Sequence, residues 1–197
     1  MKKLKRTANF LFEVGTLRKI PRSHMQTLML SDLSDNIASH SFRVSIIGWF
    51  LASEEKVDPY KVVMMCLFHD TAESRSGDQN WVHKSYVKVF EDEIVRDQIS
   101  DLPKKKELSN VISEYHDRKT KESLIAKDAD LIDQILLLKE YSWLGNQEAM
   151  DWLGKNKGSG NMQYKLLKTK SAKLLADEII KQKPSDWWSH KWTEKRR

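Results

Sequence analysis

The longest apolar run of the chain ends in a histidine and carboxylates whose spacing could support metal chemistry. The run is Val62–Phe68, and His69, Asp70 and Glu73 follow it directly. On a helix, His69 and Glu73 share a face because they are four residues apart, and Asp70 lies on its flank. Imidazole and carboxylate groups together bind divalent cations, and a nearby glutamate could move protons to or from an attacking water. Taken alone, the His-Asp pair is more typical of a helix end at which the histidine is satisfied and the carboxylates are exposed.

Two further segments place the same residue types on apolar helices. His40 shares a helical stripe with Ile37 and Val44, where a neutral histidine must find a partner or bind a ligand. The strongly apolar segment AKDADLIDQILLLKEY contains three aspartates: Asp128, Asp130 and Asp133. Buried carboxylates are costly unless they are paired or bind a metal. A histidine, a His-Asp pair and an aspartate, each on an apolar helix, therefore predict a metal site.

The elements that position these groups are predicted to be helices. Prolines and glycines are few, and apolar residues recur at helical spacing along nearly the whole sequence. Asp58 and Pro59 are a typical N-cap and first helical residue. We expect helices over 37–52, 58–69, 82–100, 106–117, 122–144 and 162–183. The chain is thus predicted to be all-α, one domain over residues 1–197 with a core over about 10–183, a flexible loop over 153–161 and a basic, aromatic tail over 184–197.

Composition and charge limit the classes of function. At 197 residues, with 40% hydrophobic and 31% charged residues, the chain is typical of a globular protein, and no apolar run approaches the ~20 residues that span a bilayer. Glu13 interrupts the apolar part of the N-terminus, so we expect no signal peptide. The single cysteine, Cys66, favours a reducing, cytoplasmic location.

The net charge of +6 belongs to the two ends of the chain. Residues 1–6 carry four positive charges and residues 191–197 a net three, so the remainder carries −1. Solvated, frayed ends explain this distribution better than a nucleic-acid-binding surface. Nucleic acid is therefore not an expected partner, and neither is a membrane.

The motifs resemble those of the HD-domain metal-dependent phosphohydrolases, and most closely the compact 5′-deoxynucleotidase-type subgroup. The matching features, over about residues 10–145, are Arg22, IASHSFRV, HDTAESRSGD and KDAD. The later segment LKTKSAKLLADEI is similar to the closing helix of that subgroup. The resemblance implies a single compact HD-domain helical bundle.

The resemblance also implies a metal site and its catalytic residues. His40, His69, Asp70 and Asp130 would bind one divalent ion, which could be Mn, Co, Ni, Zn, Fe or Mg. Glu73 would act with Asp70 in catalysis, as the general acid or base. Asp128 stays an alternative to Asp130, because it lies closer to the best apolar stripe of its helix.

Further residues match substrate-binding positions of the subgroup. Arg22 and Lys84 would bind phosphate, which suits a planar fork and a point charge, although Lys84 could equally be a surface lysine. Asp78 corresponds to the residue that contacts the sugar. The chain departs from the subgroup at PRSHMQT, which lacks an aromatic residue after the arginine, and at Ser39, where an acid is common. These departures bear on the preference for 2′-deoxyribose.

The expected activity is release of phosphate from nucleoside 5′-monophosphates, and from 2′-deoxynucleotides in particular, by a homodimer. Two alternatives remain open. The same site could serve a nucleoside triphosphate pyrophosphatase or triphosphohydrolase. The chain could also be a non-enzymatic helical module that binds a nucleotide, or nucleic acid through its basic ends.

Overall fold

The computed structural model describes residues 2–154 and 161–191, and it is helical throughout this part of the chain. Its helices are α1 (Lys2–Val14), the 3-10 helix η1 (Gly15–Lys19), α2 (His24–Leu28), α3 (Ile37–Glu54), α4 (Pro59–Phe68), α5 (Glu73–Ser76), α6 (Trp81–Tyr86), α7 (Glu91–Ile99), α8 (Lys105–Asp117), α9 (Lys121–Trp143), α10 (Gln147–Trp152), α11 (Met162–Leu166), α12 (Lys170–Lys181) and α13 (Asp186–Ser189). The described residues form no β-strand, and a single bridge joins Pro21 to Asn36. The prediction of an all-α fold is confirmed.

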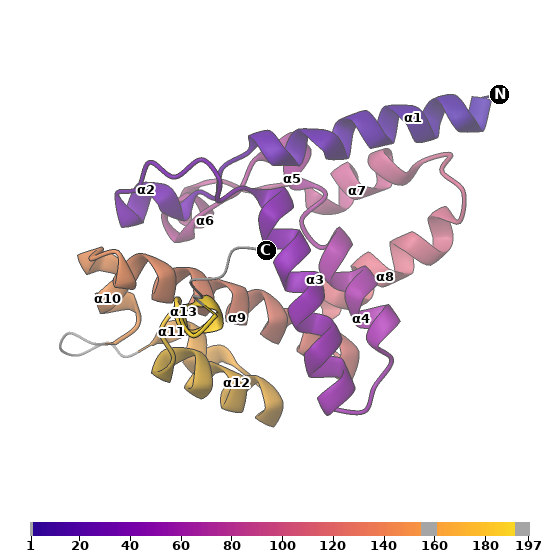
Figure 1. The fold of residues 1–197 in the computed structure, drawn as a ribbon. Helices are drawn as coiled ribbons and strands as arrows, with labels where there is room; N and C mark the ends of the chain where they lie inside the picture. Colours follow the sequence, from indigo (N-terminus) through magenta and orange to yellow (C-terminus); the bar gives the residue numbers. More distant parts are fainter. Residues whose placement is uncertain (1, 155–160, 192–197) are drawn as a thin grey trace.

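Helix α9 is the centre of the bundle. Helices α3, α4, α8, α10, α11 and α12 all pack against it, as Figure 1 shows. A capping box between Thr120 and Ser123 begins α9, and Ile125, Ile132 and Leu138 along it are fully buried in the core. Because the helix that carries the aspartates is surrounded, those aspartates must be partnered inside the protein.

Helices α3 and α4 lie against each other at a glycine. A Cβ at Gly48 would meet the Cys66 Sγ at 2.7 Å and the Val62 Cγ1 at 3.0 Å. This close approach brings the His40 end of α3 beside the C-terminal end of α4, where His69 follows. The packing therefore sets the distance between the two histidines.

Helix α1 covers a second, smaller core and was not predicted from the sequence. It lies across the top of the molecule near α5 and α7 (Figure 1), and its Phe10 packs in a cluster with Ala72 and Ile99. The guanidinium of Arg6 donates to the backbone carbonyls of Gln98 at 2.9 Å and Ser100 at 3.1 Å. The expected solvated N-terminal end is thus wrong at Arg6, because the carbonyls at the end of α7 bind it.

Two predicted helices are each divided in the structure. The segment 82–100 forms α6 and α7, separated by extended residues from Val87 onward. The segment 162–183 forms α11 and α12, because Asp128 accepts hydrogen bonds from the backbone N–H groups of Lys168 and Thr169. These bonds cap α12 from outside, so the break comes from tertiary contacts.

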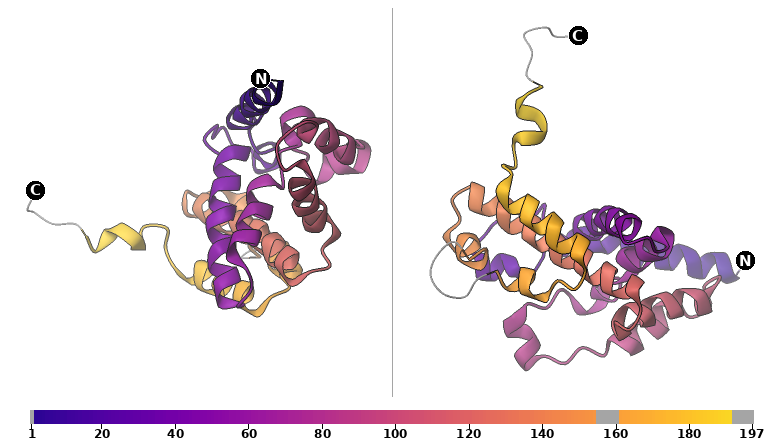
Figure 2. Two further views of the ribbon diagram at one scale, coloured as in Figure 1. Left: turned by 90° about the vertical axis from the view of Figure 1, so that its right-hand side faces the viewer. Right: turned by 90° about the horizontal axis from the view of Figure 1, so that it is seen from below.

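The described part of the predicted tail projects from the bundle. Figure 2 shows α13 standing away from the other helices, and Trp187 in it is exposed. Most of the predicted loop 153–161 and the residues after 191 lie outside the described residues. Within the described ranges, no helix is both long and apolar enough to cross a bilayer.

Candidate active site

The two histidines meet where α3 begins and α4 ends. Asn36 and Ser39 form a capping box at the start of α3, which places His40 in the first turn. The Ser39 side chain has the N3 role that Glu or Gln often fills in a capping box. His69 caps α4, and the Nε2 atoms of His40 and His69 lie 3.3 Å apart.

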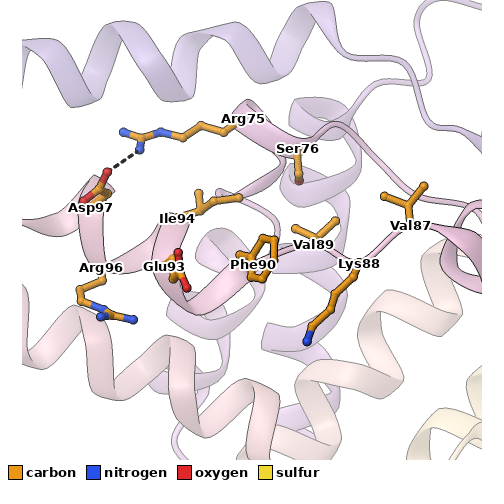
Figure 3. Close-up of a pocket in the computed structure, with 10 residues that line it drawn as sticks. All are labelled: Arg75, Ser76, Val87, Lys88, Val89, Phe90, Glu93, Ile94, Arg96 and Asp97. Carbon is orange, nitrogen blue, oxygen red and sulfur yellow. Dashed lines mark hydrogen bonds and ion pairs between the residues drawn. The ribbon is translucent and has the colours of Figure 1, made fainter.

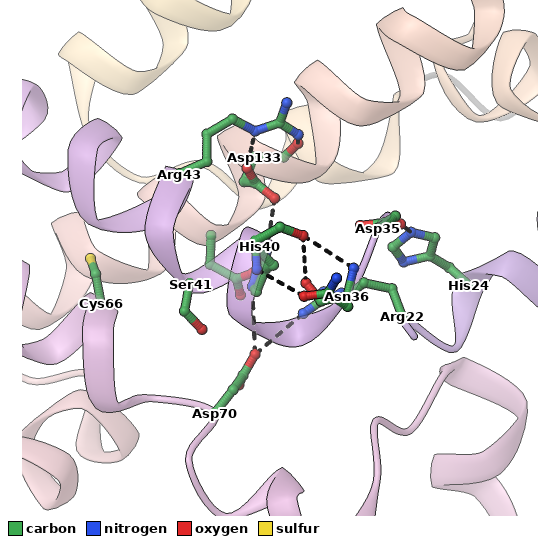
Figure 4. Close-up of polar contacts among 12 residues, drawn as sticks. Arg22, His24, Asp35, Asn36, His40, Ser41, Arg43, Cys66, Asp70 and Asp133 are labelled. Atoms are coloured by element: carbon green, nitrogen blue, oxygen red, sulfur yellow. Dashed lines mark hydrogen bonds and ion pairs between the residues drawn. The ribbon is translucent and has the colours of Figure 1, made fainter. Parts of the chain in front are cut away.

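The second nitrogen of each imidazole has a partner that orients the ring. The His69 Nδ1 lies 2.7 Å from the Cys66 carbonyl oxygen, which can only accept, so this nitrogen is the donor. The His40 Nδ1 lies 2.7 Å from the Asp133 Oδ2 and donates to it. Figure 4 shows His40 between Asp133 and Asp70. Both rings therefore turn their Nε2 atoms toward the same point, as metal-binding histidines do, and both would be neutral with a divalent ion bound there.

Two carboxylates complete this cluster. The Asp70 Oδ2 lies 3.0 Å from the His69 Nε2 and 3.5 Å from the His40 Nε2, and the Asp130 Oδ1 lies 3.3 Å from the His40 Nε2. Ligand atoms of His40, His69 and Asp130 lie within 4.8 Å of one another. Two imidazole nitrogens and two carboxylates that converge below the surface are a donor set that fits a divalent cation.

The environment keeps both carboxylates ionised. Burial alone would raise the pKa of Asp70, but the His69 charge and hydrogen bonds from His40 and His69 hold it well below the usual range. Burial likewise opposes ionisation of Asp130, and its pKa is held well below the usual range by Lys127 and the same two histidines. The Lys127 Nζ donates to the Asp130 Oδ2 at 2.6 Å. Both carboxylates are available as anionic ligands at neutral pH.

Asp128 and Asp130 have different surroundings, although they are two residues apart on α9. Asp128 is fully buried and accepts hydrogen bonds from the Lys168 N–H at 2.9 Å and from the N–H and hydroxyl of Thr169 at 2.7 and 2.6 Å. Asp130 lies beside His40. The Asp128 carboxylate is thus engaged at the start of α12, and Asp130 faces the histidines.

Arg22 lies between two acids of the site. Its Nη1 donates to the Asp70 Oδ2 at 3.3 Å, and its Nε lies 3.6 Å from the Asp78 Oδ2. The Asp78 Oδ2 also accepts a 2.7 Å hydrogen bond from the Ser23 backbone N–H. The buried Arg22 Nε has no other partner among the described groups than this long ion pair to Asp78.

The surroundings of Glu73 favour its neutral, protonated form. Burial, followed by the negative charges of Asp70 and Asp78, raises the pKa of Glu73 from 4.5 to about 10. Its buried Oε2 has no hydrogen-bond partner among the described groups. A neutral carboxylic acid beside two carboxylates can donate a proton at neutral pH.

A cavity of about 300 Å³ opens onto this cluster. Seven of the eight predicted site residues line it, namely Arg22, His69, Asp70, Glu73, Asp78, Lys84 and Asp130. His40 lies behind its wall. Tyr115 and Arg118 also line the cavity, and the Arg118 guanidinium stacks 4.1 Å from the centre of the Tyr115 ring.

No role was predicted from the sequence for Asp133, Tyr115 or Arg118. The position of Asp133 one turn after Asp130 was a signal that could have suggested a partner for a ligand. Arg118 ends α8 with a left-handed backbone (φ 54°), and nothing in the local sequence indicates where its side chain points.

A second cavity lies next to the first, with Ser76, Val87 and Val89 lining both. Figure 3 shows its lining, where Arg75 pairs with Asp97 across one end. It is larger, about 560 Å³, but none of the predicted site residues lines it. The predicted site residues therefore point to the smaller cavity.

Comparison with known proteins agrees with this geometry. A model of the HD domain matches residues 14–169. The chain is 28% identical over 123 residues to the 5′-deoxynucleotidase HDDC2 of Dictyostelium discoideum, an alignment that covers 56% of this chain and 64% of that protein, just under two thirds of its length. The mouse 5′-deoxynucleotidase HDDC2 is 24% identical over 143 residues, covering 70% of this chain and 71% of the relative.

Solved structures show the same fold. A conserved hypothetical protein from Pyrococcus furiosus superposes with a TM-score of 0.72 at 22% identity, covering 89% of this chain and 99% of the other. A predicted metal-dependent phosphohydrolase from Magnetospirillum magnetotacticum superposes with a TM-score of 0.67 at 22% identity, covering 90% and 91%.

Proposed function

The chain belongs to the HD domain family, and from this premise we propose that it is a metal-dependent phosphohydrolase acting on nucleoside 5′-monophosphates, with 2′-deoxynucleotides preferred. The observation that carries the proposal is the convergence of the His40, His69, Asp70 and Asp130 side chains beside Arg22, at a cavity that all of them except His40 line. The relatives named 5′-deoxynucleotidase support the choice of substrate.

The proposed ligands of one divalent ion are His40, His69, Asp70 and Asp130. The orientation of both imidazoles by their Nδ1 partners supports this assignment, and the engagement of Asp128 elsewhere supports Asp130 as the last ligand. A divalent ion in this position supplies a Lewis acid for attack on a phosphate ester.

The remaining steps fall to groups of the chain itself. Arg22 binds the phosphoryl oxygens and offsets the charge that builds on them. Glu73, which is protonated, donates its proton to the ester oxygen as the bond from phosphorus to the nucleoside breaks, and it recovers a proton from the attacking water. The products are inorganic phosphate and a nucleoside.

Two residues on the Arg22 side of the cavity are proposed to bind the rest of the substrate. The Asp78 Oδ2 accepts a hydrogen bond from the Ser23 backbone N–H, and we propose that its Oδ1 accepts one from a sugar hydroxyl. Lys84 lines the same cavity, and its ammonium group suits a phosphate oxygen.

The test is a panel of nucleoside mono- and triphosphates, ribo- and deoxyribo-, with Mn²⁺, Co²⁺, Ni²⁺, Zn²⁺, Fe²⁺ or Mg²⁺ added. We expect inorganic phosphate from deoxynucleoside monophosphates, lost in Asp70→Ala and retained in Asp92→Asn, which changes an exposed acid of α7. Tripolyphosphate or pyrophosphate as the product would instead establish the triphosphohydrolase or pyrophosphatase alternative. If no combination of nucleotide and metal ion gives turnover, and the protein binds nucleic acid in a salt-sensitive way, the alternative of a non-enzymatic binding module would be favoured.

We also propose a homodimer, formed through an exposed apolar surface of α3 and α4. This α3–α4 face consists of Phe42, Ile46, Trp49, Phe50, Tyr60, Met64 and Leu67, which are 37–70% exposed. At ~150–250 Å² for a large side chain, it presents roughly 700 Å², close to the ~800 Å² that each partner buries in a standard interface. Such a face is unusual for a monomer.

Sedimentation of the full chain tests the dimer. Phe50→Glu should give a monomer, whereas Leu4→Glu, at an exposed leucine of α1 outside the α3–α4 face, should not. A dimer unaffected by Phe50→Glu would exclude this interface. We further assign the protein to the cytoplasm, in keeping with the free, buried thiol of Cys66.

A further inference from the structure

We propose that Glu13 of α1 and Gln98 of α7 are positioning residues that hold the short helix α5 so that Glu73 faces the cavity. The inference rests on the proposed function, in which Glu73 is the proton donor. It concerns groups outside the metal cluster and outside the HDTAESRSGD motif.

Glu13 binds the two residues that directly follow Glu73. Its Oε1 accepts from the Arg75 Nε at 2.6 Å and from the Ser74 hydroxyl at 3.3 Å, and its Oε2 accepts from an Arg75 Nη at 3.2 Å. This carboxylate is ionised at neutral pH. Burial would raise the pKa of Glu13, but hydrogen bonds from Arg75 and Gln98 keep it below the usual range. The helix α1 is thereby joined to α5 by a bidentate ion pair.

Gln98 contacts the chain both before and after Glu73. Its amide is 1% exposed, and its Nε2 lies within donating distance of the Thr71 carbonyl at 3.1 Å, the Ser74 hydroxyl at 2.8 Å and the Glu13 Oε1 at 2.8 Å. The contacts at Thr71 and Ser74 lie on either side of Glu73 in the chain. A buried amide that is satisfied in this way specifies one arrangement of the backbone around it.

Helix α5 needs such external contacts. It contains only four residues, its N-cap Ala72 makes no side-chain hydrogen bond, and Gly77 ends it with a positive φ of 71°. A single turn is not stable on its own. The Glu73 Oε2 has no hydrogen-bond partner among the described groups, so the backbone, rather than a contact to the carboxyl group, sets the position of the acid.

The HD domain match begins at residue 14, directly after Glu13. Arg6 strengthens the same connection, because it binds the carbonyl of Gln98. The positioning contacts therefore come from α1, of which only Val14 lies in the matched region, and from α7.

The first test separates binding from catalysis. Glu13→Ala should lower kcat by about 100-fold, as misplacement of a catalytic group by about 1 Å can do, with KM and bound metal per chain unchanged. Glu13→Gln keeps an acceptor oxygen and should retain more of kcat. Asp92→Asn removes the charge of an exposed side chain of α7 that does not contact α5, and its kcat should match that of the wild type.

A double-mutant cycle tests whether Glu13 affects kcat through Glu73. In a Glu73→Gln background, Glu13→Ala should cause no further loss of kcat, because its effect passes through Glu73. If the losses of the two substitutions multiply, Glu13 does not act through Glu73 and the proposal is overturned.

Hydrogen exchange tests, without any substrate, whether Glu13 and Gln98 hold the backbone around α5. Glu13→Ala and Gln98→Met should speed amide exchange over residues 71–77 and leave α9 unchanged. Unchanged exchange over 71–77 would overturn the proposal even in an active enzyme. An inactive wild-type protein with faster exchange in the variants would instead refute the proposed function and leave the connection between α1 and α5 established.

Discussion

The His40 Nδ1 lies 2.7 Å from the Asp133 Oδ2, and Arg43 donates to the other oxygen of the same carboxylate. Asp133 follows Asp130 by one turn of α9. One helix therefore supplies a proposed metal ligand and the group that orients another. The ring of His40 is fixed with its Nε2 toward the cluster because Asp133 is itself fixed by Arg43.

Replacing Asp133 with alanine is expected to weaken metal binding by about 10- to 100-fold, the usual cost of removing the partner of a ligating histidine. Titration of the metal-free protein with Mn²⁺ against a competing chelator measures the affinity. Glu140→Gln is the control, because Glu140 binds Arg43 but not His40. Equal metal affinities in Asp133→Ala and the wild type would contradict the assignment.

The two nearby aspartates of α9 should have separable effects. Asp128→Ala removes a buried carboxylate with three hydrogen bonds, so it should lower the free energy of unfolding by about 2–4 kcal/mol while the metal stoichiometry stays unchanged. Asp130→Ala should lose the metal with a smaller change in stability. Urea unfolding and metal analysis of both variants check this, and the reverse pattern would make Asp128 the ligand.

The sequence pattern predicted the central helices closely. The expected helices 37–52, 58–69, 106–117 and 122–144 correspond to α3, α4, α8 and α9 within two residues at each end, because caps and apolar periodicity are local properties. The breaks between α6 and α7 and between α11 and α12 were missed. The second break depends on Asp128, which is 40 residues away from Lys168, and no local pattern contains that contact.

The candidate site, too, was predicted from the sequence only in part. The resemblance to the HD-domain phosphohydrolases identified seven residues that line one cavity, because the motifs of a family keep residue type and order along the chain. His40 is oriented by Asp133, which is 93 residues away in the sequence. Glu13 binds the turn after Glu73 through Ser74, which is 61 residues away. Neither contact is contained in a local pattern. The burial that keeps Glu73 protonated is likewise a property of the packed structure.

Glu73 should make the metal-free protein less stable as the pH rises. Its pKa is about 10 in the folded protein against 4.5 ordinarily, so only the unfolded chain ionises between these values, and the stability that the protonated group contributes is lost progressively from pH 4.5 to about 10. Glu73→Gln cannot ionise. In chelator, the unfolding midpoint of Glu73→Gln should therefore exceed that of the wild type at pH 9, with a smaller difference at pH 5.

The same substitution should lower kcat by about 10²- to 10⁴-fold, the usual contribution of a general acid. Glu93→Gln, at an exposed glutamate of α7, is the control for both measurements. A midpoint difference that does not grow between pH 5 and pH 9 would show that Glu73 is not held protonated by its surroundings.

Gly48 should be required for the approach of α3 to α4, and through it for the metal site. In Gly48→Ala the new methyl group would lie 2.7 Å from the Cys66 Sγ, so the helices must separate, at a cost of about 1–3 kcal/mol that opposes the ~1 kcal/mol gained from alanine in a helix. We expect a net loss in urea unfolding and weaker Mn²⁺ binding, because His40 and His69 lie on the two helices. Gly15→Ala, whose methyl group has no neighbour closer than 4.0 Å, should show neither effect. Adding Cys66→Ala to Gly48→Ala removes the sulfur and should restore part of both losses; an unchanged double variant would mean that this contact does not set the spacing.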